Sequence, residues 1–322
     1  MALFDVVIGF VYCSVSLIMI FLNATILLTT ARDREYKTCT YRTIKHSCLA
    51  CIMQLSAFFT TARDREYKTC TYRIIKHSCL ACIMQLSAFF AGGLMTMAGT
   101  TFHYHFDRIF GAFVQSGWFL YLALSLTLAV DRFLIFVSSK SRKINNTAST
   151  VLLSASWIFW FCVFVAMFIP SCGYTYKDKA GLYLWDYTNE RGSHYMQDVE
   201  AYVDLIMLGL VFLVYVLVFA HLIKLKRKTA VQSTSFKLEI RIVIIAVISF
   251  TYESLFVIIN FWIPDELSKQ IPMLIIINLS WIIDCGIMAF VLLLANAKLR
   301  GRTKKLFVKK KRNLIFVSSA PC

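Results

Sequence analysis

Proline, glycine and acidic residues are all scarce in this sequence of 322 residues. The 4 prolines and 12 glycines are too few for a disordered or low-complexity chain. Asp and Glu total 18 against 34 Lys and Arg, which leaves a net charge of +16. In a soluble protein such an excess would indicate nucleic acid. Here the basic residues fall in short runs between apolar blocks, so we expect no nucleic-acid partner.

The sequence also lacks the motifs of several functional classes. It contains neither a Gly-x-Ser-x-Gly nor a His-Glu-x-x-His motif, so we do not expect an enzyme, a metal site or a cofactor. A channel would need a filter-like loop or a ring of charged residues, and neither is apparent. A transporter would more often interrupt corresponding helices of two halves with Gly or Pro. These absences disfavour an enzyme, a channel and a transporter.

Long apolar blocks dominate what is present. The chain is 58% hydrophobic with a mean hydropathy of +0.65, whereas soluble domains are about 45–50% apolar. A helix needs roughly 20 apolar residues to cross the hydrocarbon core. The sequence therefore predicts an all-α, polytopic bundle of seven transmembrane helices, in the blocks 6–28, 74–98, 111–137, 149–170, 202–223, 240–263 and 271–295.

The basic residues predict how these helices are oriented. Outside residues 29–59 the chain has 29 Lys and Arg. With the N-terminus outside the cell, only Arg108, Lys177, Lys179, Arg191 and Lys269 fall on the outer side, and the other 24 are cytoplasmic. Cytoplasmic loops carry such an excess of positive charge. We therefore expect a seven-transmembrane domain over residues 1–300, with the N-terminus outside, and a basic cytoplasmic tail over residues 301–322.

A tandem duplication interrupts this pattern. Residues 29–59 recur as residues 60–90 with one difference, Thr43 against Ile74. The apolar part of the first copy, Ser47–Phe59, is too short to cross a bilayer, so we expect that copy not to span. The duplication also creates two CxxC pairs inside apolar sequence, which we interpret as buried thiols and not as a zinc site.

Two stretches carry a resemblance to a known family. "SLTLAVDRFLIFV" places Asp131, Arg132 and Phe133 at the end of the third span, where rhodopsin-like receptors have an acidic-Arg-aromatic triplet. The stretch from residue 70 to 136 and the tail "LLLANAKLR" resemble the nematode seven-helix serpentine chemoreceptors, of class T or class xa. Trp157 in the fourth span matches a tryptophan that such receptors often have there. The resemblance covers most of residues 61–300.

The resemblance implies a G-protein-coupled chemosensory receptor in the plasma membrane, in a sensory cilium if it is chemosensory. A small-molecule ligand would enter from outside and a heterotrimeric G protein would bind inside. Asp131 would hold Arg132 at rest, and activation would free Arg132 for the G protein. A purely structural ion pair is the alternative. A receptor relic that no longer signals, or a transporter, remains a second interpretation of the whole chain.

Several polar and aromatic residues within the spans are candidates for a ligand pocket or a polar network. Charged groups in spans are costly and usually functional, but interhelical hydrogen bonding or aromatic packing would explain the same residues. The candidates are Gln115, Trp118, Tyr121, Tyr252, Glu253, Asn278 and Asp284.

The family comparison also reveals departures. The seventh span lacks Asn-Pro-x-x-Tyr, and Cys172 has no cysteine near the start of the third span with which to form the usual outer disulfide. The tail sequence "KLRGRTKKLFVKKKR" is expected to attract anionic lipid.

Overall fold

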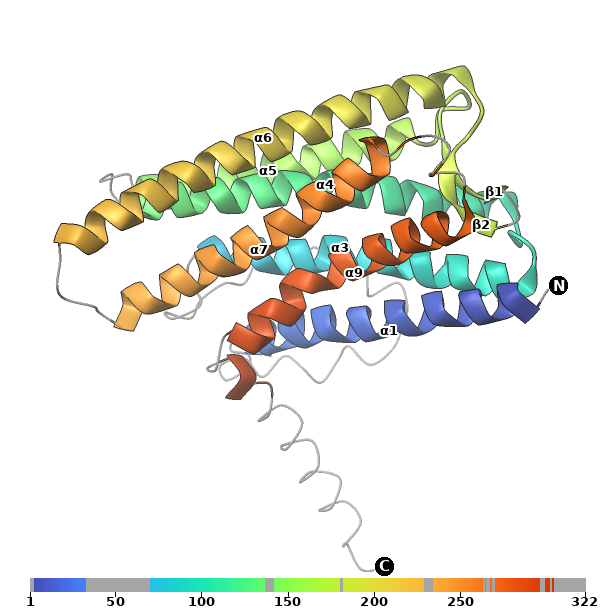
Figure 1. Cartoon of the computed structure of the whole chain (residues 1–322). Coiled ribbons are helices and arrows are strands. Elements are labelled where there is room, and N and C mark those ends of the chain that lie inside the picture. The colour runs from blue at the N-terminus through green and yellow to red at the C-terminus, as the bar shows by residue number, and fades with distance from the viewer. Residues whose placement is uncertain are drawn as a thin grey trace, which may run out of the picture.

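Seven long helices form the body of the protein (Figure 1). The computed structural model describes residues 3–32, 70–136, 142–179, 182–228, 234–262, 264, 267, 270–295, 299–301 and 303. Seven helices in these ranges are long and apolar enough to cross a membrane, which confirms the predicted seven-helix bundle. They are α1 (Leu3–Arg32), α3 (Cys70–Ala98), α4 (Tyr104–Phe136), α5 (Arg142–Ala166), α6 (Arg191–Lys228), α7 (Thr234–Trp262) and α9 (Ile271–Ala295).

Several helices are longer than the apolar blocks that predicted them. α4 begins at Tyr104 and α6 at Arg191, whereas the blocks begin at about residues 111 and 202. The length of an apolar block reflects the thickness of the hydrocarbon core. A helix can extend beyond the block into the polar boundary, because its backbone hydrogen bonds are made within the helix. The first turns of α4 and α6 therefore carry charged residues that a hydropathy pattern assigns to loops.

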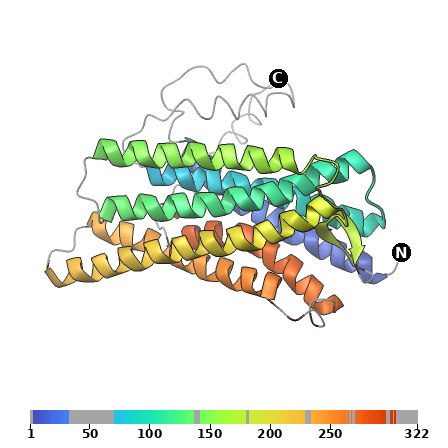
Figure 2. The ribbon, with the colours of Figure 1, turned by 90° about the horizontal axis from the view of Figure 1, so that it is seen from above.

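α4 is the central helix of the bundle. It packs against α3, α5, α6 and α7, and its buried residues extend from Asp107 to Arg132. Seen from above, α4 runs between α5 and α6 (Figure 2). The outward faces of α1 and α6 expose large apolar side chains such as Phe21 and Leu213, as expected where a helix meets lipid.

α1 and α3 pack closely and run antiparallel. A Cβ at Gly9 would lie 2.6 Å from the carbonyl oxygen of Gly93, and such small residues let two membrane helices approach. The segment between them, 33–69, therefore starts and ends at the same end of the bundle. The second copy of the duplication forms most of α3. The first copy, and with it the prediction that it does not span, lies largely outside the described residues.

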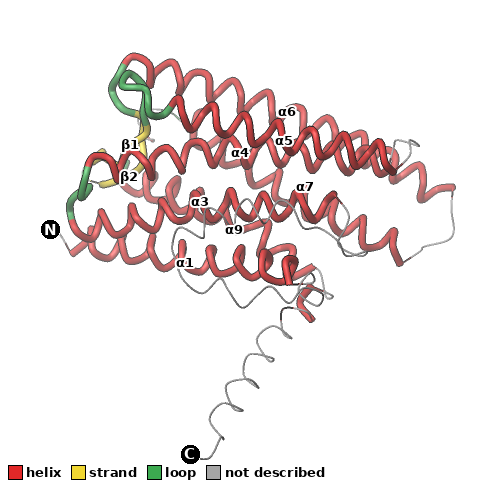
Figure 3. Tube along the Cα trace, turned by 180° about the vertical axis from the view of Figure 1, so that it is seen from behind, coloured by secondary structure: helices red, strands yellow, loops and turns green. Residues whose placement is uncertain are grey.

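A β-hairpin closes one end of the bundle. β1 (Tyr174–Lys179) pairs antiparallel with β2 (Leu182–Tyr187), with Tyr174 opposite Tyr187, and the tube view places it beside the start of α4 and α6 (Figure 3). Its Tyr174, Tyr176, Leu182 and Trp185 are buried. We call this the hairpin end and the opposite end the Arg132 end. The alternating "YTYKDK" and "LYLWDY" runs around Ala-Gly are a strand signal that the helix-centred sequence analysis missed.

Two charged residues at the start of α4 hold this hairpin. The backbone N–H of Tyr176 donates to Asp107 Oδ1 at 2.7 Å. Arg108 Nη2 donates to the carbonyls of Ile169 at 3.2 Å and Cys172 at 2.7 Å. Cys172 is a free cysteine. These charge-assisted hydrogen bonds join the third span to the loop between α5 and α6, which is the connection that the absent disulfide would have made.

Gly111 is where the backbones of α4 and β1 meet, and it provides a test of this packing. A Cβ at Gly111 would overlap the carbonyl oxygen of Tyr174, so Gly111→Ala is expected to displace the hairpin and cost about 1–3 kcal/mol. Thermal unfolding of the purified protein measures this. Gly209→Ala is the matched control, because nothing lies within 4 Å of its added methyl group. Equal melting temperatures for the two variants would contradict the close approach.

Candidate functional site

At the Arg132 end, Asp131 joins three helices. Its Oδ2 accepts hydrogen bonds from Thr71 of α3 at 2.6 Å and from Arg132 Nη2 at 2.7 Å, and its Oδ1 accepts one from Ser149 of α5 at 2.9 Å. Asp131 and Arg132 are 4% and 1% exposed. A buried carboxylate is tolerated when its charge is paired and its oxygens accept hydrogen bonds, and both conditions hold here. We call these four residues the Asp131 clasp.

Phe133 lies on the other side of the same turn. It packs with Phe136 against a small apolar cluster formed by Val218 and Leu222 of α6 and Val243 of α7. The triplet that the sequence singled out therefore connects to both sides of the bundle. Asp131 contacts α3 and α5, while Phe133 contacts α6 and α7.

Halfway along the bundle, three polar residues from three helices form what we call the acid layer: Tyr121 of α4, Glu253 of α7 and Asp284 of α9. All three are buried, and Glu253 and Asp284 are close enough to interact electrostatically. Ser125 Oγ lies 3.4 Å from Glu253 Oε1. The Tyr121 hydroxyl, Glu253 Oε2 and both Asp284 oxygens have no hydrogen-bond partner among the described residues. The acid layer thus contains buried polar atoms without hydrogen-bond partners among the described residues, whereas both carboxylate oxygens of Asp131 accept hydrogen bonds.

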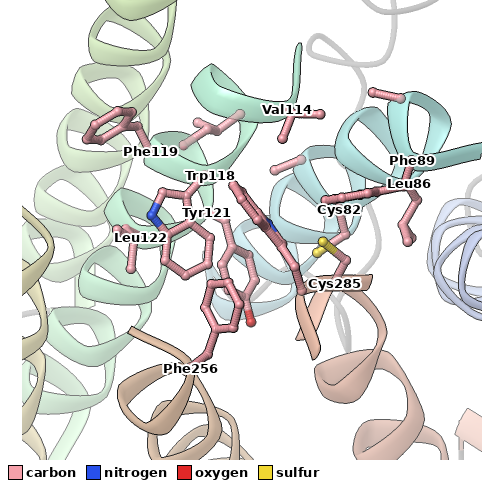
Figure 4. Packing of buried hydrophobic residues seen from close by; sticks show 14 of the residues in the cluster. Cys82, Leu86, Phe89, Val114, Trp118, Phe119, Tyr121, Leu122, Phe256 and Cys285 are labelled. Carbon is pink, nitrogen blue, oxygen red and sulfur yellow. The ribbon is translucent and has the colours of Figure 1, made fainter. Parts of the chain in front are cut away.

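Three aromatic rings lie next to the acid layer, one helical turn closer to the hairpin end. Trp118, Phe256 and Trp281 are each three residues from Tyr121, Glu253 and Asp284 respectively, and we call them the aromatic layer. Their ring centroids are 5.5–5.7 Å apart in all three pairs, at interplanar angles of 54–69°, which are favourable geometries for aromatic pairs. Figure 4 shows Trp118, Tyr121 and Phe256 together, beside Cys82 and Cys285.

The aromatic layer is fixed by hydrogen bonds to two other helices. Trp281 Nε1 donates to Gln85 Oε1 of α3 at 2.9 Å. Trp118 Nε1 donates to Asp204 Oδ2 of α6 at 3.0 Å. A change at Asp204 would therefore reach Trp118 directly, and through it the other two rings.

Between the aromatic layer and the hairpin lies a second polar group. Gln115 Nε2 donates to the hydroxyl of Tyr187 at 2.7 Å, and that hydroxyl donates to Glu200 Oε2 at 2.8 Å. Burial, reinforced by the neighbouring Glu200 carboxylate, raises the pKa of Tyr187 well above its usual range. The phenol therefore stays protonated at neutral pH and can serve as the donor. This chain of bonds joins α4, the hairpin and α6.

The sequence analysis missed Glu200 and Asp204. Both lie near the start of α6, at the edge of the apolar block, and the pattern therefore placed them at the boundary of a loop. Their spacing of four residues puts them on one helix face, and this is the signal that would have found them once the helix was known to begin at Arg191.

Tyr252 and Asn278 do not belong to either polar group by hydrogen bonding. Tyr252 donates to the carbonyl oxygen of Ser280 at 3.0 Å, which joins α7 to α9. Asn278 is buried, but it does not bond to Asp284, whose oxygens lack partners among the described residues. Asn278 and Asp284 are therefore not joined by a direct hydrogen bond.

An open apolar groove of about 450 Å³ lies between α6 and α7, and its lining includes exposed side chains such as Phe219. Its lining also includes Phe212, Tyr215, Val247 and Phe250, with Thr251 as a polar member. The groove contains none of the candidate site residues. It leaves room beside the half of α7 that adjoins the Phe133 cluster.

Comparisons with known proteins bear on this arrangement. A family model described as "Serpentine type 7TM GPCR chemoreceptor Srt" matches residues 33–315. This chain belongs to the Srt family of serpentine chemoreceptors. Of the two classes that the sequence suggested, the match supports class T. The Srt receptor is accordingly a multi-pass membrane protein of a G-protein-coupled receptor family.

The fold of this Srt receptor is also that of a solved receptor. The crystal structure of squid rhodopsin aligns with a TM-score of 0.60 over 93% of this chain and 86% of the rhodopsin chain, at 10% sequence identity. At that identity the likeness concerns the fold alone. No curated protein sequence matches the chain.

The Tyr187 hydroxyl can be removed without changing the ring. Tyr187→Phe would leave Glu200 and Gln115 without their shared partner, and an unsatisfied buried group costs about 1–3 kcal/mol. We expect a lower melting temperature and easier proteolysis at the hairpin. Tyr183→Phe in the same strand is the control, because Tyr183 is only partly buried. If both variants melt alike, the hydrogen-bond chain does not hold the hairpin.

Proposed function

We propose that this Srt receptor detects a small extracellular ligand at its hairpin end and activates a heterotrimeric G protein at its Arg132 end. The proposal places the N-terminus outside the cell and the C-terminus in the cytoplasm, in the plasma membrane. The observation that carries it is the Asp131 clasp, which keeps Arg132 buried in an ion pair at one end of a seven-helix receptor bundle.

In this proposal the bundle has two states, and a ligand shifts their populations by binding one state better. The resting state has Arg132 paired with Asp131, and Asp131 bound by Thr71 and Ser149. The active state releases Arg132 toward the G protein. The Phe133 cluster supports movement of α7 against α6, because only a small apolar cluster joins the two helices there.

The ligand site of the proposal lies beneath the hairpin, where Gln115 and Trp118 face Glu200 and Asp204. The aromatic layer and the acid layer, with Tyr121, Glu253 and Asp284, connect that site to the Arg132 end along α4, α7 and α9. The basic tail, which lies largely outside the described residues, is assigned to anionic lipid.

Arg132→Ala tests the coupling. Membranes that contain the receptor are mixed with a panel of purified Gα subunits and Gβγ, and nucleotide exchange is measured without ligand and with mixtures of candidate odorants. We expect exchange above background for the native receptor and a loss to background for Arg132→Ala at equal receptor abundance. Unchanged exchange in the variant would contradict the role of Arg132.

Ser149→Ala tests the clasp separately. Removing one hydrogen bond to a buried carboxylate is expected to cost about 1–2 kcal/mol, and because that bond belongs to the resting state, basal exchange should rise by up to about tenfold. Ser154→Ala is the matched control on the same helix, since Ser154 is exposed and bonds only to the carbonyl of Thr150. Basal exchange that stays constant or falls in Ser149→Ala would argue for a purely structural ion pair.

A non-signalling relic is the second candidate, and the duplicated segment favours it. Residues 29–59 add a nearly identical copy of sequence next to the second span. A relic would fold and reach the membrane but would not promote exchange on any Gα subunit. The same exchange assay therefore separates the two candidates.

A further inference from the structure

Two acidic side chains beneath the hairpin are buried close to each other. Glu200 and Asp204 lie one turn apart on α6, are 5% and 0% exposed, and interact electrostatically with each other. Lys177 of the hairpin is paired with Asp186 at 3.3 Å. Arg108 is bonded to the carbonyls of Ile169 and Cys172. Within the described ranges neither Glu200 nor Asp204 forms an ion pair with Lys, Arg or His.

The same region also has fewer hydrogen-bond donors than acceptors. Tyr187 and Trp118 each satisfy one oxygen of this carboxylate pair. Asp204 Oδ1 and Gln115 Oε1 are buried acceptors with no partner among the described residues. Gln115 and Trp118 are one turn apart on α4, opposite Glu200 and Asp204 on α6, so the two unpartnered acceptors belong to one small region between these helices.

What this region needs is a group with a positive charge and several N–H donors. An ammonium group has both properties, since it carries one charge and up to three donors. Aromatic rings on the border suit it as well. The rings of Tyr174 and Tyr187 are 5.0 Å apart in an edge-to-face pair, and Trp118 donates to Asp204. Cations bind favourably to such rings when they lose water.

We propose that this receptor's ligand is an organic amine whose ammonium group binds between Glu200 and Asp204, with Gln115 Oε1 as a further acceptor. The inference rests on the proposed function, which places the ligand at the hairpin end. The acid layer holds the other pair of buried acidic residues without an ion pair among the described residues. The three rings of the aromatic layer lie in mutual contact between that pair and the hairpin. A ligand that enters past the hairpin meets Glu200 and Asp204 first.

A thermal-shift experiment on the purified full-length receptor tests the amine directly. Methylammonium, butylammonium and 2-phenylethylammonium chlorides are compared at pH 7 with methanol, butanol and 2-phenylethanol, which have the same carbon skeletons without the charge. Sodium chloride at the same concentrations controls for ionic strength and for an inorganic cation. We expect at least one ammonium compound to raise the melting temperature by several degrees, while its alcohol and sodium do not.

The variants assign that shift to the site. Asp204→Asn and Glu200→Gln are expected to weaken the apparent affinity for the ammonium probe at least tenfold. Asp198→Asn is the matched control, because it removes the same charge from an exposed position on the same helix, and it should keep the native affinity. If Asp204→Asn does not fold, Gln115→Met serves instead, since it removes the unpartnered carbonyl and keeps a side chain of similar length.

Three results would overturn the inference. They are no shift with any ammonium probe, an equal shift with the alcohol or with sodium, and an undiminished shift in both Glu200→Gln and Asp204→Asn. The binding measurement contains no G protein, so it is independent of the coupling assay. A receptor that promotes nucleotide exchange through Arg132 but binds no amine refutes this inference alone. One that binds the amine and activates no Gα subunit refutes the proposed function alone.

Discussion

A carboxylate buried among membrane helices needs either a positive charge or hydrogen-bond donors, and this requirement organises the interior of the receptor. Five acidic residues in the spans illustrate it: Asp131, Glu200, Asp204, Glu253 and Asp284. Asp131 has an arginine and two hydroxyl donors within hydrogen-bonding distance. Of the other four, Glu200, Asp204 and Glu253 accept hydrogen bonds from a hydroxyl or an indole N–H. Asp284 has no hydrogen-bond partner among the described residues, and none of the four has an ion pair within the described ranges. Because lipid supplies neither water nor counterions, such a difference is expensive and is usually linked to function.

The buried acidic residues differ in how many hydrogen-bond and ion-pair partners they have, and this difference depends on their position along the bundle. At the Arg132 end the charges are satisfied within the protein, so that end is stable until something competes for Arg132. In the acid layer and beneath the hairpin, by contrast, some acceptors have no partner among the described residues, and two of these, on Gln115 of α4 and Asp204 of α6, lie beneath the hairpin. The hairpin covers them through Tyr176, Tyr187, Asp107 and Arg108 without neutralising them. This is the polarity expected of a molecule that is completed by a ligand at one end and by a protein at the other.

The apolar blocks predicted all seven helices because the hydrocarbon core imposes a length that any spanning helix has to meet. The hairpin and the polar group beneath it were not predicted for two physical reasons. The strands are short and lie in a loop, and the partners are far apart in sequence, as Gln115 and Tyr187 or Trp118 and Asp204 are. Glu253 and Asp284 could be singled out from the sequence because a charged residue inside an apolar block is conspicuous, and Asp131 and Arg132 because they form part of a triplet known in rhodopsin-like receptors. Glu200 and Asp204 could not, because they lie at the edge of a block, and no pattern within one helix tells which helix it will face.

α4 carries residues of every polar and aromatic group described above, and it therefore connects these groups to one another. Gln115, Trp118, Tyr121, Ser125 and Asp131 lie along this one helix, so the polar group beneath the hairpin, both central layers and the clasp share a rigid element. α7 adds a second connection, since Phe256 belongs to the aromatic layer, Glu253 to the acid layer and Val243 to the Phe133 cluster. A positive charge bound at Asp204 would compete with the Trp118 N–H for its carboxylate, and a shift of Trp118 is transmitted to Phe256 because their rings are in contact. Energetic coupling between two sites acts equally in both directions. A G protein that stabilises the released state of Arg132 would therefore also raise the affinity of the hairpin end for its ligand.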